Sequence, residues 1–209
     1  MHGGAVDPSK HVAPTPFRFF SENPSKSMTE QADEILARRA AAGDRNAFSE
    51  LLERHYDLIY RVGARMLGGG AEAEDLAQDV CVGLVTRLAS YGGQSRFTTW
   101  LYRVVVNAAR DAMRRNATRR RNEQEFVEQD VRGHRRSSSG GEDSIWLQQV
   151  LGQLSEELRA TVILVLAEGL RHGEAGKILG VSEATVSWRL HQVRKQLRGQ
   201  KAQTERMVL

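Results

Sequence analysis

The first residues that could form a functional site are arginines repeated at helical spacing. In the stretch TTWLYRVVVNAARDAMRRN, residues 98–116, apolar side chains fall on one side of a helix and polar ones on the other. Guanidinium groups bind phosphate oxygens in bidentate fashion, so this polar side suits a nucleic-acid backbone. An ordinary solvated face is the alternative, although Asp111 is the only acid in the stretch. The polar side holds Arg103, Asn107, Arg110 and Arg114.

A second candidate surface is acidic and lies on the preceding helix, which we expect over residues 72–89. Acids near a helix N-terminus stabilise the helix by themselves, but this does not explain Asp79, where Val82 continues the outer face. A protein–protein contact is the other interpretation, and charge alone leaves both open. The surface comprises Glu74, Asp75, Gln78, Asp79 and Val82, and the expected apolar face comprises Leu76, Ala77, Val80, Cys81, Leu84, Val85 and Leu88.

The clearest pattern is HGEAGKILGVSEATVSWRLHQVRKQLR, residues 172–198. Ala175 and Gly176 would let another helix approach closely, Gly180 can take a positive φ, and Ser182 can cap the next helix. The pattern is typical of a helix-turn-helix, whose second helix enters the major groove of DNA. A plain helical hairpin with a basic outer face is the alternative. The expected apolar stripe is Val186, Leu190, Val193 and Leu197, which leaves Ser187, Arg189, Gln192, Arg194, Lys195 and Arg198 as the polar remainder.

Residue sets typical of enzymes are missing from the sequence. The histidines are scattered without an HExxH pattern, and no Walker-type glycine loop precedes a Lys-Ser or Lys-Thr pair. GGG at 68–70 is better explained as a helix stop, and His55 as a helix-surface or partly packed residue and not a ligand. The single cysteine, Cys81, excludes an internal disulfide and a cysteine-based zinc site. We therefore expect no enzyme activity, no cofactor and no bound metal.

The composition indicates a soluble, globular and mainly helical chain. Of its 209 residues, 40% are hydrophobic, 27% are charged and 6% are aromatic. The formal net charge is only +4, so its distribution along the chain is more informative than its sum. No apolar stretch is long enough to span a bilayer, and the N-terminus lacks the apolar core of a signal peptide. We expect a cytoplasmic protein without stable membrane insertion.

The elements that position these residues are predicted to be all-α, in two small helical domains joined by a flexible linker. Thr29 is expected to cap a first helix that ends near Gly43, and Asp44 to cap the next. PFRFF, residues 16–20, is a candidate docking motif in a proline-rich tail. The expected divisions are a tail over 1–28, a helical bundle over 29–116, an arginine-rich linker over 117–143, a helix-turn-helix domain over 144–198 and a tail over 199–209.

Three segments, taken in order, resemble an extracytoplasmic-function (ECF, group IV) sigma factor of bacterial RNA polymerase. They are AEDLAQDV (73–80), RFTTWLYRVVVNAARDAMRR (96–115) and the helix-turn-helix block over 154–198. The resemblance covers about residues 30–198. It implies a promoter-specificity subunit that binds core RNA polymerase, recognises the minus-thirty-five and minus-ten elements and promotes strand opening.

The resemblance also implies a role for each segment. The acidic helix would bind the clamp helices of the largest polymerase subunit through Glu74, Asp75, Gln78, Asp79 and Val82, and the polymerase flap is a further implied contact. The minus-ten element, partly single-stranded, would be bound by Tyr91, Gln94, Ser95, Arg96, Thr98, Thr99, Trp100, Arg103, Asn107, Arg110, Arg114 and Arg115. The minus-thirty-five element, as duplex DNA, would be bound by Ser182, Glu183, Thr185, Ser187, Trp188, Arg189, Gln192 and Arg194. A cognate anti-sigma factor is a partner implied by the resemblance alone.

The chain departs from the family pattern in its third helix, in its recognition helix and in its unusually arginine-rich linker. Cys81 and Val85 stand where large aromatic residues are usual, which implies a smaller core in that helix. Trp188 stands near the DNA-facing side where a small polar residue is common, so it is a candidate to alter promoter choice. A stand-alone regulator, with 29–116 as a sensor or dimerisation bundle, is the competing hypothesis. Such a bundle has no reason to carry a basic face behind a glycine loop.

Overall fold

The described chain is built of helices, with no strand in residues 24–126, 148 and 150–207 of the computed structural model. This confirms the all-α fold with two helical domains. The N-terminal domain contains α1 (Pro24–Ala41), α2 (Arg45–Leu67), α3 (Ala71–Arg87), the short 3-10 helix η1 (Leu88–Ser90) and α4 (Phe97–Phe126). The C-terminal domain contains α6 (Glu156–Val162), the π-helical η2 (Ile163–Ala167), α7 (His172–Leu179) and α8 (Glu183–Met207).

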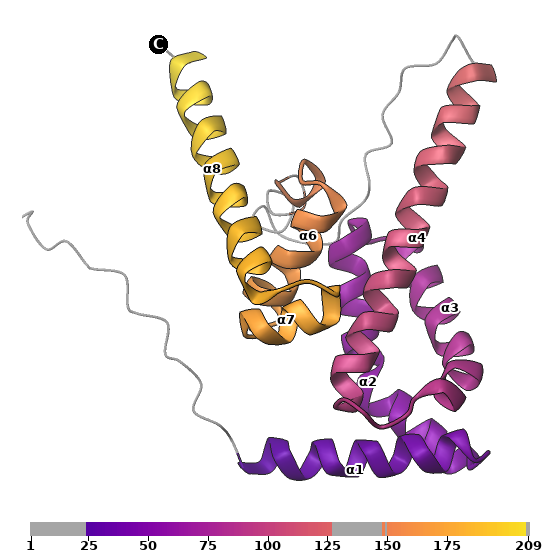
Figure 1. The fold of residues 1–209 in the computed structure, drawn as a ribbon. Coiled ribbons are helices and arrows are strands. Elements are labelled where there is room, and N and C mark those ends of the chain that lie inside the picture. The colour runs from indigo at the N-terminus through magenta and orange to yellow at the C-terminus, as the bar shows by residue number, and fades with distance from the viewer. Residues whose placement is uncertain (1–23, 127–147, 149, 208–209) are drawn as a thin grey trace, which may run out of the picture.

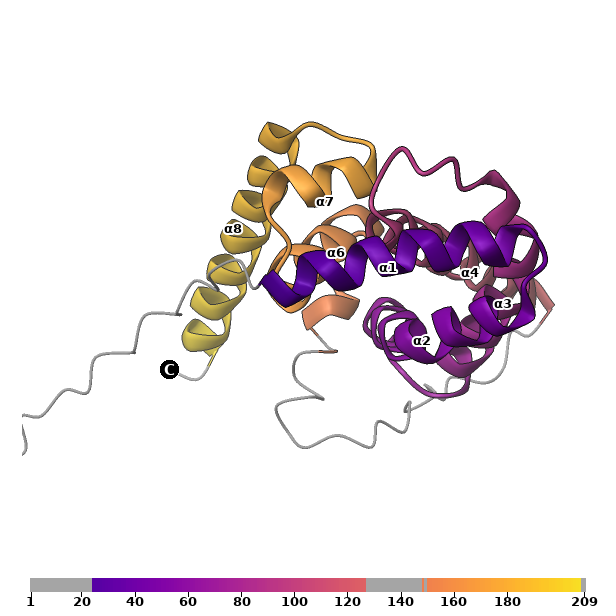
Figure 2. The same cartoon turned by 90° about the horizontal axis from the view of Figure 1, so that it is seen from below.

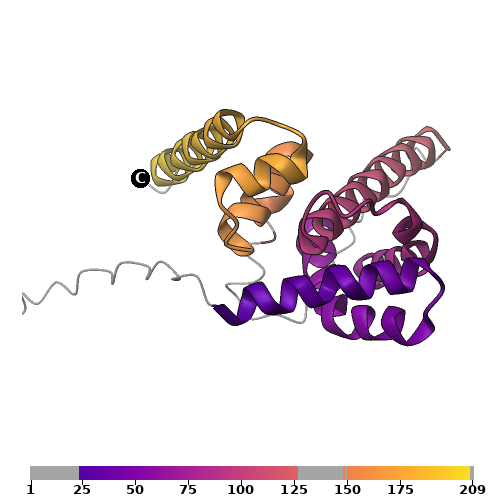
Figure 3. The same ribbon diagram turned by 60° about the horizontal axis from the view of Figure 1, so that its bottom comes forward.

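In the N-terminal domain, α2, α3 and α4 form a bundle and α1 crosses one end of it (Figures 1 and 3). Each helix turns an apolar stripe toward the common centre, as amphipathic helices do when they share a core. Complete burial of one aliphatic side chain contributes about 1.5–3 kcal/mol, so these positions dominate the stability of the bundle. The fully buried residues at its centre include Ile59, Val62, Met66, Val80, Leu101 and Val105.

The ends of α2 follow the sequence signals. The Asp44 carboxylate accepts hydrogen bonds from the backbone N–H groups of Asn46 and Ala47 at 3.0 and 3.1 Å, which confirms the predicted cap. Gly68 ends the helix with φ 92°, a left-handed conformation that glycine adopts without steric cost. The GGG segment is therefore the predicted helix stop, and it turns the chain into α3.

The C-terminal domain lies against the α2 and α4 side of the bundle, while the outer ends of α4 and α8 diverge (Figure 1). Seen from below, α2, α3 and α4 lie on one side and α7 and α8 on the other, and α1 runs across the view past α6 (Figure 2). Ile163 and Leu164 of η2 are buried together with Ala175 of α7 and Val186 of α8, and they belong to the same apolar cluster as the core of the bundle. The two domains thus touch without sharing one continuous helix.

Three predicted boundaries were wrong, all because polar sequence was taken for the end of a helix. Helix α1 begins at Pro24, so Thr29 lies inside it and does not cap it. Helix α4 continues to Phe126 and α8 to Met207, through residues assigned to the linker and the tail. Residues 117–126 contain no Gly or Pro and consist mostly of good helix formers. The PFRFF motif and the rest of the predicted linker, 127–143, lie outside the described residues.

Candidate nucleic-acid and protein interfaces

The acidic surface of α3 is exposed, and it carries more apolar area than the sequence suggested. Val82 exposes 74% of its surface, and Val85, one turn further on, exposes 61%. The prediction that Val85 lies on the apolar face was wrong, because α3 turns Leu76, Val80 and Leu84 into the core instead. Exposed apolar side chains beside fixed charges favour a protein contact over a purely solvated face. The exposed polar members are Glu74, Asp75, Gln78 and Asp79.

Cys81 lies half-buried against the core of the same helix. Burial raises the pKa of its thiol, which keeps the less reactive protonated form dominant at neutral pH. This agrees with the packing role expected for Cys81.

An aromatic cluster holds the loop that precedes α4. The Tyr91 ring lies 5.7 Å from that of Phe97, edge to face, and 5.3 Å from that of Trp100. The Tyr91 hydroxyl donates a hydrogen bond to the Ser95 carbonyl at 2.6 Å, which closes the loop over the cluster. Tyr91 is buried, so it supports the loop from beneath. Gln94, Ser95 and Arg96 are exposed on the loop, whereas Thr98, Thr99 and Trp100 are half-buried at the start of the helix.

A buried carboxylate links α1 to this cluster. Asp33, with its side chain only 2% exposed, accepts a hydrogen bond from Arg54 at 2.9 Å and lies 2.9 Å from Nε2 of His55. The His55 ring in turn lies 5.2 Å from the ring of Phe97. Of the two alternatives expected for His55, a surface or a partly packed residue, the structure has the second. Asp33 and Phe97 were missed, and only the place of Phe97 directly before TTW could have pointed to it.

The arginine face of α4 is shared between solvent and the C-terminal domain. Asn107 and Arg115 are exposed. Arg103 is also exposed, but its Nη2 donates a hydrogen bond at 2.6 Å to the carbonyl of Lys177 in α7. The predicted row of polar side chains on α4 therefore exists, and the C-terminal domain lies against the middle of it.

Arg110 is the member of this face most affected by that neighbour. It is half-buried, and its Nε has no hydrogen-bond partner within the described residues. Burial and the positive charge of Arg189 lower the pKa of Arg110. One turn on, Arg114 is exposed and lies 3.8 Å from a carboxylate oxygen of Glu156 in α6. The basic face of α4 thus lies opposite the acidic first turn of α6.

The helix-turn-helix forms with the predicted turn. Gly180 ends α7 with φ 69°, and the Ser182 hydroxyl accepts a hydrogen bond from the Thr185 N–H at 3.1 Å at the start of α8. Gly176 is approached closely by the turn and by the start of α8. A Cβ there would lie 2.7 Å from the Val181 carbonyl oxygen and 3.6 Å from the backbone nitrogen of Glu183, the first residue of α8. These three positions fix the angle between the two helices.

The outer side of α8 presents most of the predicted DNA-facing residues. Trp188 is 58% exposed, and Ser187 is tied to α7 by a 2.9 Å contact with Nδ1 of His172. Arg189 was wrongly placed on this side, because its side chain is buried and its Nη2 lies 3.3 Å from Glu157. It stands at helical spacing from the buried Val186 and therefore faces α6. Ser182, Glu183 and Arg194 are exposed, and Thr185 and Gln192 are half-buried.

The two domains meet around Glu168, which ends η2 and has a side chain only 2% exposed. Arg61 of α2 donates from Nε and Nη2 to the two carboxylate oxygens at 3.1 and 2.8 Å. The Tyr102 hydroxyl of α4 donates at 2.9 Å, and Arg65 is a further close partner. Burial alone would raise the pKa of Glu168, but hydrogen bonds from Arg61 and Tyr102 and both arginine charges outweigh it and lower the pKa.

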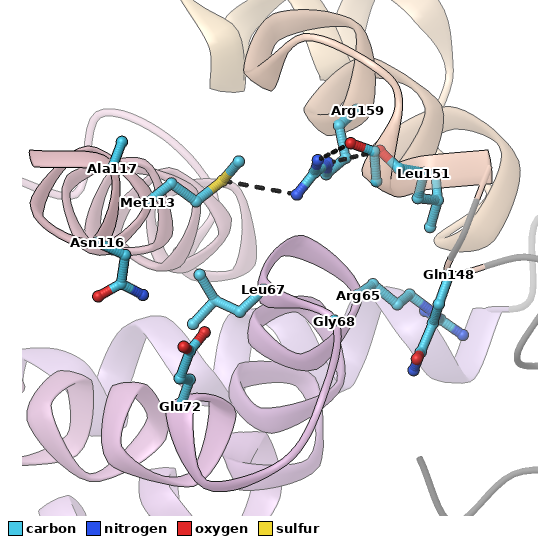
Figure 4. Close-up of a pocket in the computed structure, with 11 residues that line it drawn as sticks. Arg65, Leu67, Gly68, Glu72, Met113, Asn116, Ala117, Gln148, Leu151 and Arg159 are labelled. Atoms are coloured by element: carbon cyan, nitrogen blue, oxygen red, sulfur yellow. Dashed lines mark hydrogen bonds between the residues drawn. The ribbon is translucent and has the colours of Figure 1, made fainter. Parts of the chain in front are cut away.

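A pocket of about 230 Å³ opens beside this contact, between α2, α3, α4 and the start of the C-terminal domain (Figure 4). Arg159 points into it and donates hydrogen bonds to the carbonyls of Met66 and Leu151, both at 2.8 Å. The Met113 sulfur lies 4.0 Å from the same guanidinium (Figure 4). Arg159 therefore connects the two domains by donating hydrogen bonds to backbone carbonyls of both.

The described residues contain no group of three or more His, Cys, Asp or Glu side chains placed to hold a metal ion. Within the same residues, no helix has the length and apolar character that crossing a membrane requires. The candidate site thus consists of three contact surfaces. They are the acidic surface of α3, the basic face of α4 with the loop before it, and the helix-turn-helix of α7 and α8.

Comparison with known families identifies both domains. The family described as "Sigma-70 region 2" matches residues 51–119, and "Sigma-70, region 4" matches residues 144–197. The solved structure of CnrH in complex with the cytosolic domain of CnrY has a TM-score of 0.60 at 26% identity, covering 82% of this chain and 97% of that one.

Whole-length relatives agree with the domain matches. The ECF RNA polymerase sigma factor SigE of Mycolicibacterium smegmatis is 31% identical over 201 residues, which are 90% of this chain and 76% of the relative. SigW of Bacillus subtilis, an ECF RNA polymerase sigma factor, is 29% identical over 76% of this chain and 90% of its own length. The chain therefore belongs to the ECF family of RNA polymerase sigma factors, alternative sigma factors that direct RNA polymerase to promoters.

Proposed function

We propose that this sigma factor divides promoter recognition between its domains, with loop 91–96 and α4 at the minus-ten element and the helix-turn-helix at the minus-thirty-five element. One observation carries the proposal: an exposed loop rests on Tyr91, Phe97 and Trp100 directly before a row of arginines. A merely solvated helix needs neither the aromatic support nor the loop, whereas a helix that meets opened DNA needs both.

At the minus-ten element, the loop would read bases and the helix would bind the backbone. Gln94, Ser95 and Arg96 are exposed on the loop, with Thr98, Thr99 and Trp100 at its base. We assign Tyr91 the support of the loop, because its ring is buried. Unstacking a base costs a few kcal/mol, and phosphate contacts along α4 would offset part of that cost. Those contacts would come from Arg103, Asn107, Arg110, Arg114 and Arg115.

At the minus-thirty-five element, the first turns of α8 would enter the major groove of duplex DNA. We leave Arg189 out of the contact set, because its side chain is buried against α6. Trp188 stays in the set because it is largely exposed near the start of the helix. The proposed contacts are Ser182, Glu183, Thr185, Ser187, Trp188, Gln192 and Arg194.

Core polymerase would bind the acidic surface of α3, through the clamp helices of its largest subunit. We add Val85 to the proposed contacts Glu74, Asp75, Gln78, Asp79 and Val82, because it lies exposed one turn beyond Val82. The C-terminal domain would bind the polymerase flap. Charged residues around a small apolar centre give such a surface both affinity and orientation.

Phosphodiester bond formation would belong to the polymerase, so the proposed activity needs no catalysis, metal or cofactor in this chain. Action on promoter DNA would take place in the cytoplasm. Similarity to CnrH, solved in complex with the cytosolic domain of CnrY, supports a cognate anti-sigma factor as a further partner.

The test is in vitro transcription with core RNA polymerase. We expect the wild-type chain to give initiation at a defined promoter, and Asp75→Lys with Asp79→Lys to abolish it. Glu53→Lys with Asp57→Lys reverses the same number of charges on the exposed side of α2 and is expected to leave initiation intact. Circular dichroism of all variants confirms that they fold.

The competing hypothesis of a stand-alone regulator gives a different result. Under it, the chain alone would bind promoter DNA tightly, core polymerase would add nothing, and the α3 variant would behave like the α2 variant. Permanganate footprinting on the same complexes tests strand opening separately, since it detects unstacked thymines near the minus-ten element.

A further inference from the structure

His172 of α7 and Ser187 of α8 meet across the helix-turn-helix, with 2.9 Å between the ring Nδ1 and the hydroxyl oxygen. We propose that His172 is a specificity-determining residue at the minus-thirty-five element: its protonation decides whether the Ser187 hydroxyl donates to DNA or only accepts from it. The inference rests on the proposed function of α8. It deepens that function, because it names the group that sets what one residue of the recognition helix can bind.

Ser187 stands where a base-reading residue is expected. It is exposed one turn into α8 and directly precedes Trp188, and the first turns of a recognition helix are the part that reaches base edges. A serine hydroxyl has one proton to donate and two lone pairs that accept. Serine alone therefore binds donors and acceptors of the major groove equally. A partner that fixes the hydroxyl proton would give it a preference.

His172 is such a partner, because α7 holds its ring beside Ser187. It is the first residue of α7 and is half-buried. Within the described residues, the contact with His172 is the one hydrogen bond of the Ser187 side chain. The turn that contains Gly180 sets the path of α8 relative to α7. The contact thus belongs to the folded helix-turn-helix itself and does not depend on the rest of the chain.

The two protonation states of His172 give the hydroxyl opposite roles. When the ring is neutral and Nδ1 accepts, Ser187 donates its only proton to the ring and can only accept from DNA, as from the amino groups of adenine and cytosine. When Nδ1 takes a proton from water, both ring nitrogens donate. Ser187 then accepts from the ring, and its own proton is free for guanine N7 or O6 or for thymine O4.

The other charged groups near this contact keep their charge while histidine titrates. Helix α7 packs against α8, α4 and η2. Carboxylates titrate well below the range of histidine and guanidinium groups well above it. Among the described residues, none of the acids forms an ion pair with the His172 ring, so Ser187 is the partner that its protonation affects. The charged groups are Arg171 and Glu174 at the start of α7, Lys177 near its end, Glu183 of α8, whose carboxylate oxygen lies 3.3 Å from where a Cβ on Gly173 would be, Arg103 of α4, which reaches the Lys177 carbonyl, and Glu168 of η2, which Arg61 and Arg65 bind.

The first experiment observes the ring proton in the full chain without DNA. Proton–nitrogen NMR spectra of isotope-labelled histidine distinguish protonated from unprotonated ring nitrogens, and His172→Gln identifies the signals of His172. We expect an unprotonated Nδ1 at about pH 8 and two protonated nitrogens at about pH 5.5, across the range in which histidine changes charge. A proton on Nδ1 already at pH 8 overturns the proposal, because Ser187 would then have one role throughout.

The second experiment measures base preference with the holoenzyme. Promoter fragments that differ at single positions of the minus-thirty-five element compete for binding at about pH 8 and at about pH 6. At one position, the preferred base pair is expected to change from one that offers an amino group to one that offers N7 or a carbonyl oxygen. One hydrogen bond gained or lost changes relative affinity by about two- to tenfold. The same ranking at both pH values overturns the proposal.

Three variants assign the effect to this contact. Ser187→Ala removes the hydroxyl and His172→Gln removes the titrating ring, so each is expected to make the ranking independent of pH. His191→Gln is the matched control, because His191 is an exposed histidine one turn beyond Ser187 on the same helix. It is expected to leave the change in ranking intact. A change that persists in His172→Gln, or is lost in His191→Gln, belongs to another group and overturns the proposal. If His172→Gln does not fold, Ser187→Ala decides the outcome.

Failure of the proposed function would give a different pattern. If the helix-turn-helix does not read the minus-thirty-five element, substitutions in that element leave holoenzyme binding unchanged at both pH values, whereas the NMR result on the free chain is unaffected. If the element is read and its ranking does not move with pH, the proposed function holds and the role of His172 is refuted.

Discussion

Position 176 requires glycine, because the Cβ of any other residue type would lie 2.7 Å from the Val181 carbonyl oxygen. Backbone atoms of a tight turn cannot move aside as a flexible side chain can. We expect Gly176→Ala to destabilise the helix-turn-helix by about 1–3 kcal/mol, the usual cost of overpacking. Thermal or urea unfolding followed by circular dichroism measures it.

Gly199 provides the matched control for this substitution. It lies within α8, and a Cβ there would meet nothing within 4 Å. Gly199→Ala is expected to stabilise the helix by about 0.5–1 kcal/mol, because alanine loses less backbone entropy than glycine. Equal effects of the two substitutions would show that helix propensity, and not the turn, decides the outcome at Gly176.

Trp188 is a second single residue with a separable role. Its indole is 58% exposed near the start of α8, so its truncation removes little packing and is expected to change unfolding free energy by less than about 0.5 kcal/mol. Trp188→Ser is expected to change the ranking of minus-thirty-five sequences, since one base-pair preference is worth about 1–3 kcal/mol. Competition binding to duplexes that differ at one position measures this. An unchanged ranking would remove Trp188 from the proposed contacts.

At the scale of elements, α4 is the helix whose two sides have different tasks. Its apolar side holds the bundle through Leu101 and Val105, and its polar side is the proposed phosphate face. Replacement of Arg110 and Arg114 by alanine is expected to weaken promoter complexes of the holoenzyme and to reduce the slope of log K against log salt by about 1.4–1.8. That is the counterion release expected for two lost phosphate contacts.

The matched control removes two arginines from other exposed surfaces. Arg38 and Arg45 lie on α1 and α2, outside all proposed DNA contacts. Alanine at both positions lowers the net charge equally and is expected to leave the salt slope unchanged. If both double variants reduce the slope to the same extent, net charge explains the effect and the α4 face does not.

Local signals explain which elements could be predicted from the sequence. Asp44, Gly180 and Ser182 act within a few residues of themselves, so their capping and turn roles followed from residue type and spacing. Helix ends that lack a capping residue or a glycine turn could not be predicted. The helices α4 and α8 are examples, because both continue through polar sequence. Arg189 was misplaced because the prediction treated only the four apolar residues of α8 as its buried face. The buried face is wider than that and includes Arg189, a charged neighbour of Val186.

At the scale of the whole molecule, the contact between the domains had no local signal at all. Glu168 is one acid at the end of an apolar helical segment, and its partners Arg61 and Tyr102 lie 107 and 66 residues away in the chain. Nothing in residue spacing shows that these side chains meet. The family resemblance supplied the two domains and their proposed partners, whereas the arrangement of one domain on the other came only from the structure.

The same contact predicts how the closed arrangement depends on pH. Around the carboxylate lie Arg61 and Arg65 of α2 and Tyr102 of α4. Arginines stay protonated in proteins. The hydrogen bond with Glu168 raises the pKa of Arg61, and burial raises the pKa of Tyr102. Glu168 is therefore the member of this set that titrates in acid, and its pKa in the closed state lies below the ordinary value of 4.5.

A depressed carboxylate pKa stabilises the closed state above the ordinary pKa, and this contribution is lost as pH falls through the depressed value. We expect the domains to stay closed from neutral pH down to about pH 5, and then to open with a slope of at most about 1.4 kcal/mol per pH unit, the limit for one proton. Double electron–electron resonance between spin labels at Asp57→Cys of α2 and Gln196→Cys of α8, in a Cys81→Ala background, reports this opening directly when it is measured between pH 7 and pH 3. Glu168→Gln should already be open at pH 7 and should lose the acid transition, whereas Glu53→Gln should keep it. A transition centred above pH 4.5, or one that survives in Glu168→Gln, would show that another group controls the contact, and would leave Glu168 as a packing residue only.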